Sequence, residues 1–406
     1  MNLSVGRTGQ MAAHKSVPTL EVLRIVVFNL ITYILIGLPL AVFPSLVHGK
    51  LGFNALTAGF LISLQYLATL ITRAPVGSLS DSRGPKHAVL AGLICAAGSG
   101  ACILMASITA SPLIVLFWLA LSRLWLGTAE SGTGTGCIAW GVGRVGAHGT
   151  AKVMSWNGVA SYGGIGIGAP LGVMLDHHAG LTGIALTTIG LSLTGVVFCL
   201  LTPGTTKIGG HRISLLKVFG HVVPFGMVLA LGSAGFGTIV AFITLYFASR
   251  GWEGAAYALS AFGVSFVAIR ILFANLIHRF GGFPVALVSL LIQFGGLILL
   301  WLAQARWQAI AGATLTGCGM SLIFPAMGTE VLQNMPAASR GAIVGAFTVF
   351  LDVALGATGP AAGLVIDYDG YAAVFLAAAI AVMIGECLAL YLFRATYFRQ
   401  RPSAAP

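Results

Sequence analysis

The chain is dominated by long apolar runs that short polar segments separate. Twelve runs reach the length of about 20 residues that a helix needs to cross a bilayer. Their extents are 25–47, 56–79, 87–108, 112–137, 154–175, 181–201, 222–247, 255–277, 284–303, 308–332, 342–365 and 373–394. The first run lacks a small-residue cleavage pattern, so we expect it to be a retained span. The pattern predicts an all-α polytopic membrane protein of 12 transmembrane helices, with no room for a separate catalytic domain.

Composition supports the same class of protein. Charged residues make up 8% of the 406 residues and hydrophobic residues 57%, whereas soluble domains carry about 25% charged residues. These values exclude a soluble enzyme, a disordered chain and a nucleic-acid-binding domain. We therefore expect no enzymatic activity, and the lipid bilayer is the expected environment.

The positions of the basic residues predict the orientation of the chain. Lys and Arg accumulate in cytoplasmic loops of membrane proteins. One set of loops and tails holds Arg7, Lys15, Arg24, Arg83, Lys86, Arg144, Lys152, Lys207, Arg212, Lys217, Arg279, Arg340, Arg394, Arg399 and Arg401, and the other holds Lys50, Arg250 and Arg306. This bias places both termini in the cytoplasm. Arg73, Arg123 and Arg270 lie inside the apolar runs.

The sequence also repeats itself. The segment from Arg73 to Gly84 aligns without a gap with the segment from Arg270 to Gly281, at an offset of 197 residues. Pro170 in span 5 aligns with Pro360 in span 11, at an offset of 190. Offsets near half the length indicate two parallel six-helix halves. The predicted parts are a cytoplasmic tail 1–22, an N-terminal bundle 23–202, a cytoplasmic linker 203–218, a C-terminal bundle 219–396 and a cytoplasmic tail 397–406.

The loop between spans 2 and 3 carries a recognisable motif. It reads Gly77-Ser-Leu-Ser-Asp81-Ser-Arg83-Gly84-Pro-Lys86, and it resembles the signature loop of the major facilitator superfamily, Gly-x-Leu-Ala-Asp-Arg-x-Gly-Arg-Lys. Ser82 and Pro85 depart from that signature. The resemblance implies a transporter whose spans 1, 4, 7 and 10 surround a central cavity. The motif loop itself is expected to act in conformational change.

A closer resemblance covers nearly the whole chain. Stretches such as Lys152-Val-Met-Ser-Trp-Asn-Gly158 and Tyr246-Phe-Ala-Ser-Arg-Gly-Trp252 are similar to the YfcJ/YhhS-type bacterial inner-membrane transporters. That group is generally placed with exporters. The resemblance therefore implies export as the direction of transport and the inner membrane as the location. Span 5 contains Gly168, Pro170 and Gly172 and is similar to the antiporter motif of exporting members. The alternative for this segment is a closely packed helix pair without directional meaning.

Ionisable residues inside the runs are the strongest candidates for function, because charges at bilayer depth are costly. Arg123 and Glu130 are seven residues apart, so two helical turns place them on one face of span 4. They are too far apart for a direct pair along one helix. The family layout points this face at the cavity. Arg123 is thus a candidate for substrate contact and Glu130 for proton coupling, and the alternative is a structural partner for each on another helix.

Asp352 in span 11 is the second candidate for proton coupling, because a carboxylate at that depth could load and release a proton. Arg73 and Arg270 occupy equivalent places in the two halves. The family resemblance puts spans 2 and 11 side by side, which makes Arg73 a possible partner of Asp352. A permanent pair would make Asp352 structural.

Neutral polar residues in the runs could also line the cavity. The candidates are Thr32, Tyr33, Gln65, Asn157 and Tyr246, although each alone is more often a packing residue. The segment from Gly141 to Gly146 matches GxGxxG, but it follows an apolar helix and is expected to be a cytoplasmic loop. We expect neither a metal nor another cofactor, with the proton gradient as the driving force.

Together these features predict a secondary active transporter that works by alternating access and has no catalytic residues. The favoured hypothesis is a proton-coupled exporter, an antiporter, of a small organic solute or drug. The alternatives are a proton symporter or uniporter that imports a nutrient, and a membrane sensor that transports nothing. The expected partners are a small-molecule substrate, protons and lipid, with the protein as a monomer.

Overall fold

Helices form the framework of the protein. The computed structural model describes residues 19–146, 149–205, 215–273, 275–333 and 340–400. In chain order the elements are α1 Thr19–Leu40, α2 Phe43–Ser45, the π-helical turn η1 Leu46–Lys50, α3 Ala55–Arg83, α4 Pro85–Ser107, α5 Pro112–Val145, α6 Thr150–Leu201, α7 Leu215–Ser249, α8 Ala255–Leu272, α9 Leu276–Phe280, α10 Gly282–Trp301, α11 Arg306–Leu332, α12 Arg340–Asp369 and α13 Ala373–Gln400.

The predicted number of spans agrees with the fold once α6 is counted twice. Among the described residues, 11 helices are long and apolar enough to cross a membrane. One of them, α6, contains two of the predicted runs, with a kink at Gly180 (φ 59°, ψ −152°) between them. Glycine adopts such a positive φ without steric cost. The all-helical, twelve-span prediction is therefore confirmed.

The helices are longer than the apolar runs that predicted them. Helix α5 continues to Val145, and its C-terminal cap is Gly146 with φ 81°. The GxGxxG segment that begins at Gly141 is thus the last turn of a helix, and the prediction of a loop there is wrong. An apolar run marks only the part of a helix that contacts lipid. The hydropathy pattern therefore did not predict the polar C-terminal end of α5.

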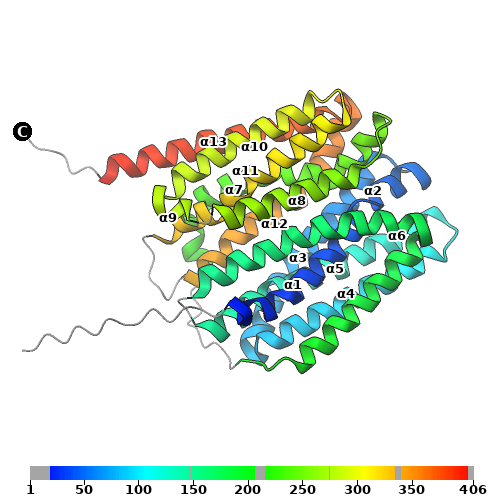
Figure 1. Cartoon of the computed structure of the whole chain (residues 1–406), viewed down its shortest axis with the longest axis horizontal. Helices are drawn as coiled ribbons and strands as arrows, with labels where there is room; N and C mark the ends of the chain where they lie inside the picture. The colour runs from blue at the N-terminus through cyan, green and yellow to red at the C-terminus, as the bar shows by residue number, and fades with distance from the viewer. Residues whose placement is uncertain (1–18, 147–148, 206–214, 274, 334–339, 401–406) are drawn as a thin grey trace, which may run out of the picture.

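The helices form two bundles that lie side by side (Figure 1). In the first, α1 packs on α6, α4 on α5 and α3 on α5; in the second, α10 packs on α11, α7 on α12 and α8 on α11. Two helix pairs, α3–α12 and α6–α8, join the bundles. Most of the linker and of both tails lies outside the described residues, so the domain boundaries stay predictions.

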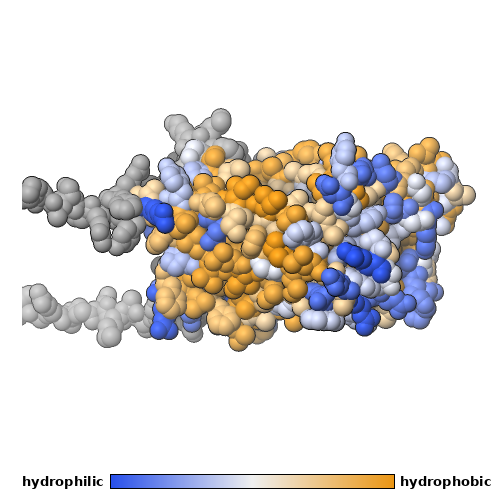
Figure 2. All heavy atoms as spheres, turned by 90° about the horizontal axis from the view of Figure 1, so that it is seen from above, coloured by the Kyte–Doolittle hydropathy of each residue, from blue (hydrophilic) through white to orange (hydrophobic). Residues whose placement is uncertain are grey.

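The outer surface matches a lipid environment. Figure 2 shows a broad apolar area over the middle of one face, with hydrophilic residues more frequent toward the ends. Large apolar side chains such as Phe117, Val264 and Leu291 are exposed on the protein. In water such an area would favour aggregation, whereas in a bilayer it meets apolar lipid chains.

Glycine contacts set the distance between α1 and α6. Gly168 of α6 lies against Ile34 and Gly37 of α1, and Gly172 lies against Leu38. A Cβ atom on Gly172 would come within 2.8 Å of the Cα of Leu38, which no real side chain tolerates. The antiporter-like segment, in which Pro170 lies between these glycines, thus forms a close helix contact inside the first bundle.

This contact predicts that Gly172→Ala destabilises the protein. The added methyl group has to displace backbone, so we expect a loss of about 1–3 kcal/mol, measured as a lower unfolding temperature of the purified protein. Gly190→Ala is the matched control on the same helix, because a Cβ atom there meets nothing within 4 Å. Equal unfolding temperatures for both variants would contradict the packing argument.

Candidate functional site

Glu130 lies in a polar cluster inside the first bundle. It is 8% exposed and accepts hydrogen bonds from Tyr33 Oη at 2.9 Å, Gln65 Nε2 at 2.9 Å and Thr69 Oγ1 at 3.2 Å. These residues come from α1, α3 and α5. All three donors are neutral, so hydrogen bonds rather than an opposite charge hold this carboxylate inside the bundle.

A glycine brings the two helices of this cluster together. Gly127, one turn before Glu130 on α5, faces the backbone of α3, and a Cβ atom there would strike the carbonyl oxygen of Gln65. Any larger residue would separate α3 from α5. Gly127 therefore determines how closely Glu130 approaches Gln65 and Thr69.

Arg123 belongs to the same cluster through Gln65. Its Nη1 atom donates to Gln65 Oε1 at 2.9 Å, while the amide nitrogen of Gln65 donates to Glu130. Gln65 thus lies between Arg123 and Glu130 and hydrogen-bonds to both. The Arg123 side chain is fully buried and lies 5.1 Å from the ring centroid of Phe43. Its Nε and Nη2 atoms have no hydrogen-bond partner in the described part of the chain.

Arg73 and Asp352 form an ion pair between the two bundles. Arg73 Nη2 donates to Asp352 Oδ1 at 2.8 Å, and Arg73 Nε donates to Asp352 Oδ2. The expected partnership of spans 2 and 11 is thus confirmed. Asp352 is 3% exposed, and the two-pronged geometry holds its carboxylate on the guanidinium of α3.

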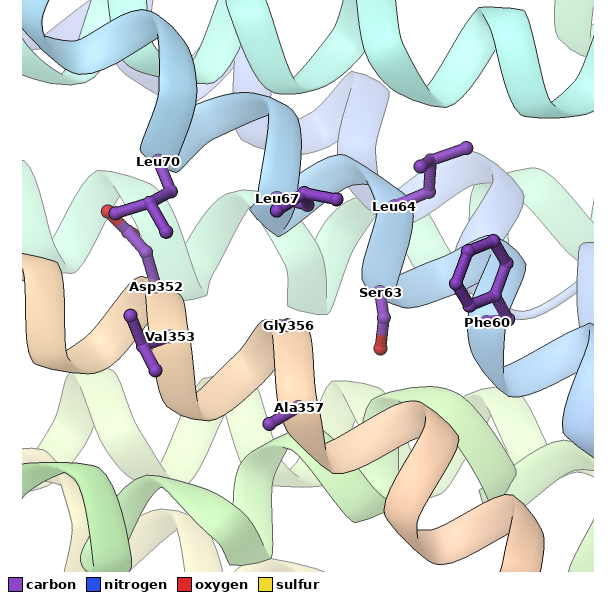
Figure 3. Close-up of a pocket in the computed structure, with 9 residues that line it drawn as sticks. All are labelled: Phe60, Ser63, Leu64, Leu67, Leu70, Asp352, Val353, Gly356 and Ala357. Carbon is purple, nitrogen blue, oxygen red and sulfur yellow. The ribbon is translucent and has the colours of Figure 1, made fainter.

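A groove of about 200 Å³ runs beside this ion pair, between α3 and α12. Figure 3 shows Asp352 near Leu70 at one end of the groove and Phe60 at the other. The rest of its lining is apolar except for Ser63, whose hydroxyl donates to the Leu355 carbonyl at 3.3 Å. Exposed Leu67 and Val353 border the groove, so it opens on the outer surface of the protein.

Arg270 of α8 is buried without a carboxylate. It is 6% exposed, its guanidinium lies 5.0 Å from the ring centroid of Phe266, and its Nε atom has no hydrogen-bond partner among the residues that the structure describes. No ion pair to Arg270 occurs among the described residues. Its surroundings thus differ from those of Arg73, its equivalent in the first half.

The remaining cavity candidates lie in different places. Thr32 is buried and donates to the Phe28 carbonyl of its own helix at 3.2 Å. The carbonyl of Asn157 accepts from Asn29 Nδ2 at 3.2 Å, which ties α6 to α1. Tyr246 donates to the Leu300 carbonyl at 3.0 Å inside the second bundle. The structure therefore brings Tyr33 and Gln65 to Glu130, but not Tyr246.

The motif loop makes the turn between α3 and α4. Gly84 is the one residue between the two helices. Its φ of 99° lies in a region that glycine adopts more readily than other residues. Lys86 Nζ donates to the carbonyls of Leu200 at 2.9 Å and Thr202 at 2.8 Å, so it caps the C-terminal end of α6. Asp81 and Arg83 are exposed.

Sequence inspection missed two residues that contribute to these contacts. Thr69 donates to Glu130, and Phe43 lies under the guanidinium of Arg123. Thr69 follows Gln65 by one helical turn, so its spacing was the available signal. No signal marked Phe43, because an aromatic residue in an apolar run is ordinary.

Twelve spans in two helical repeats, with an ion pair between the bundles, are the architecture of a membrane transporter. The profile of the Major Facilitator Superfamily matches residues 25–359, and the chain belongs to that superfamily. Its members are transporters rather than enzymes.

Relatives and solved structures agree with this assignment. The chain is 47% identical over 377 residues to uncharacterized MFS-type transporters of Burkholderia pseudomallei strain 1106a (93% of each chain) and Pseudomonas aeruginosa strain UCBPP-PA14 (93% of this chain, 94% of the relative). Its fold resembles the human organic anion transporter MFSD10, with a TM-score of 0.67 at 18% identity (92% and 99% covered). It also resembles a variant of the nucleoside transporter NupG, with a TM-score of 0.69 at 15% identity (92% and 100% covered).

The ion pair predicts strongly non-additive effects of mutation. Asp352→Asn leaves the half-buried Arg73 without its counter-charge, and we expect a loss of about 1.5–3 kcal/mol of stability. The double variant Arg73→Gln with Asp352→Asn removes both charges and should be less destabilised than Asp352→Asn alone. Thermal unfolding of the purified variants measures both effects.

Asp367→Asn is the control for this prediction, because Asp367 is an exposed carboxylate on the same helix. We expect its unfolding temperature to stay near that of the unmodified protein. Additive losses in the double variant would show that Arg73 and Asp352 contribute independently.

Proposed function

We propose that this chain is a proton-coupled secondary transporter that moves a small organic solute by alternating access. Glu130 carries the proposal: it is a buried carboxylate that only neutral donors hold. Such a group can gain or lose a proton without breaking a direct ion pair. We propose a bacterial inner-membrane location, cytoplasmic termini and a monomer, in line with the YfcJ/YhhS-type resemblance.

Glu130 is a better proton carrier than Asp352 in this arrangement. Protonation of Asp352 would weaken both of its hydrogen bonds to Arg73 and leave that cation unpaired. Asp352 therefore acts as a tie between α3 and α12. Glu130 is the proton site of the proposal, and its bond with Gln65 links it to Arg123.

Packing between the bundles supports alternating access. The bundles pack closely at the end that carries Lys50 and Arg250. A Cβ atom on Gly59 there would lie 2.6 Å from the ring of Phe242. The hydroxyl oxygen of Tyr371 and Nε2 of His48 are 3.1 Å apart. At the other end, a Cβ atom on Gly77 or Gly345 meets nothing within 4 Å. With the orientation that the basic residues favour, the closely packed end is the periplasmic one.

Two modes of coupling follow from different observations. The resemblance to exporters and the segment around Pro170 favour antiport, in which the solute leaves as a proton enters. The second candidate is symport, and an excess of interior cations favours it. Among the described residues, Arg123 and Arg270 are buried and Arg73 is half-buried, whereas the buried carboxylates are Glu130 and Asp352. Protonation of Glu130 therefore makes the site more attractive to a negative solute.

The measurement that separates these modes is proton flux in proteoliposomes. Metabolites that change in a strain lacking the gene supply the candidate solutes, and a pH-sensitive dye inside the vesicles reports proton movement. A solute that enters with protons acidifies the interior, whereas exchange makes it alkaline. No proton movement with any solute that the protein transports would contradict proton coupling.

The proposal predicts that Glu130→Gln uncouples the two flows. The amide preserves the shape of the side chain but cannot exchange a proton, so solute-driven proton movement should fall to that of empty vesicles. Exchange of labelled against unlabelled solute should persist, which shows that the variant is folded. Glu253→Gln, at an exposed carboxylate after α7, is the control. If Glu130→Gln vesicles retain normal proton flux, Glu130 is not the coupling site.

A further inference from the structure

The two helix pairs that join the bundles are equivalent in the repeat. The offset of 197 that aligns Arg73 with Arg270 relates α3 to α8, and the offset of 190 that aligns Pro170 with Pro360 relates α6 to α12. The α3–α12 contact therefore corresponds to the α8–α6 contact. In the structure α3 packs directly on α12, and α8 packs directly on α6.

A serine hydrogen bond occurs at both of these interfaces. Ser63 of α3 donates to the Leu355 carbonyl of α12 at 3.3 Å, and its equivalent Ser260 of α8 donates to the Gly166 carbonyl of α6 at 2.9 Å. A serine in the same place of each repeat thus makes the same kind of contact across the bundle interface.

The correspondence does not extend to the partners of the two arginines, Arg73 and Arg270. Asp352 neutralises Arg73, but the residue that aligns with Asp352 in α6 is Tyr162. The hydroxyphenyl ring of Tyr162 stacks on Phe266 with centroids 3.7 Å apart, and Phe266 also lies under the guanidinium of Arg270. The second interface has kept its cation and has an aromatic residue in place of the carboxylate.

The contacts of Arg270 do not compensate for its burial. A cation over an aromatic face gains part of what it loses on leaving water, but much less than a bidentate carboxylate supplies. Its Nε atom has no hydrogen-bond partner within the described ranges. On the α6 side the guanidinium faces Gly158, which has no side chain, and a Cβ atom there would be 3.7 Å from Nη1. Buried charges are otherwise paired in proteins.

We propose that Arg270 binds the acid group of the transported solute, so that the substrate is a small organic anion. The planar guanidinium matches the two oxygens of a carboxylate or the oxygens of a phosphonate. The aromatic side chains beside it, Tyr162 and Phe266, suit an apolar body next to that acid group. The substrate supplies at α6–α8 the negative charge that Asp352 supplies at α3–α12.

This inference rests on the proposed transport function and decides between its two modes. Protonation of Glu130 leaves an excess of positive charge, which an anion at Arg270 reduces. Binding of the anion in turn adds negative charge, which a proton on Glu130 reduces. Their binding is therefore cooperative, and linkage makes the effect reciprocal. An anionic substrate selects symport over antiport.

Binding of acids and of their neutral amides to the purified protein in lipid nanodiscs tests the inference. The probes are sodium acetate, hexanoate and benzoate beside acetamide, hexanamide and benzamide, at constant ionic strength, with sodium phosphate as the inorganic anion. We expect at least one organic acid to raise the unfolding temperature while its amide does not. In Arg270→Gln the apparent affinity for that acid should fall by about tenfold or more, and Arg270→Lys should retain part of it.

A matched pair at Tyr162 gives a second test that does not remove the arginine. Tyr162→Asp supplies an internal carboxylate, as at Asp352, and should abolish the response to the acid. Tyr162→Asn changes the shape in nearly the same way without the charge and should keep the response.

Several outcomes would overturn the inference. They are amides that stabilise as well as acids, no response to any of the acids, a response to phosphate equal to that of the organic acids, an unchanged response in Arg270→Gln, or equal responses in the two Tyr162 variants. Because the measurement contains no flux and no proton gradient, it can fail while proton-coupled transport holds, and it can succeed while that transport fails.

Discussion

The cost of placing a charge away from water organises the interior of this protein. The surroundings of the buried ionisable side chains offset that cost to different degrees. Asp352 and Arg73 neutralise each other across the bundle interface, Glu130 is held by three neutral donors, and Arg270 has an aromatic ring. These three solutions differ in what they allow: an ion pair resists change, a hydrogen-bonded carboxylate can accept a proton, and an unpaired cation can accept an anion.

Small residues determine whether those side chains can meet. Glu130 reaches Gln65 only because Gly127 lets α5 contact the backbone of α3. Gly168 and Gly172 do the same for α6 and α1. In lipid the close approach of helices depends on such contacts, because apolar surfaces gain little from leaving a solvent that is itself apolar. These glycines therefore contribute to the geometry of the site as well as to the fold.

The sequence was sufficient for features that depend on periodicity and on repeats. Run lengths predicted the spans, a spacing of seven placed Arg123 and Glu130 on one helix face, and the repeat with the family layout paired Arg73 with Asp352. It was insufficient where the rotation of a helix decides the contact. Tyr246 points to the Leu300 carbonyl in its own bundle, and hydropathy carries no information on that rotation.

The unequal interfaces bear on how the bundles move. Separating α3 from α12 at Arg73 and Asp352 breaks an ion pair, whereas separating α6 from α8 lets water reach Arg270 and lowers the cost of its charge. The second interface thus favours opening when it is empty. An anion at Arg270 removes that preference, because the cation no longer needs water, and so stabilises the closed interface relative to the open one. A ligand that binds one state more tightly shifts the population toward it, which is the property that transport by rocking bundles requires of its substrate.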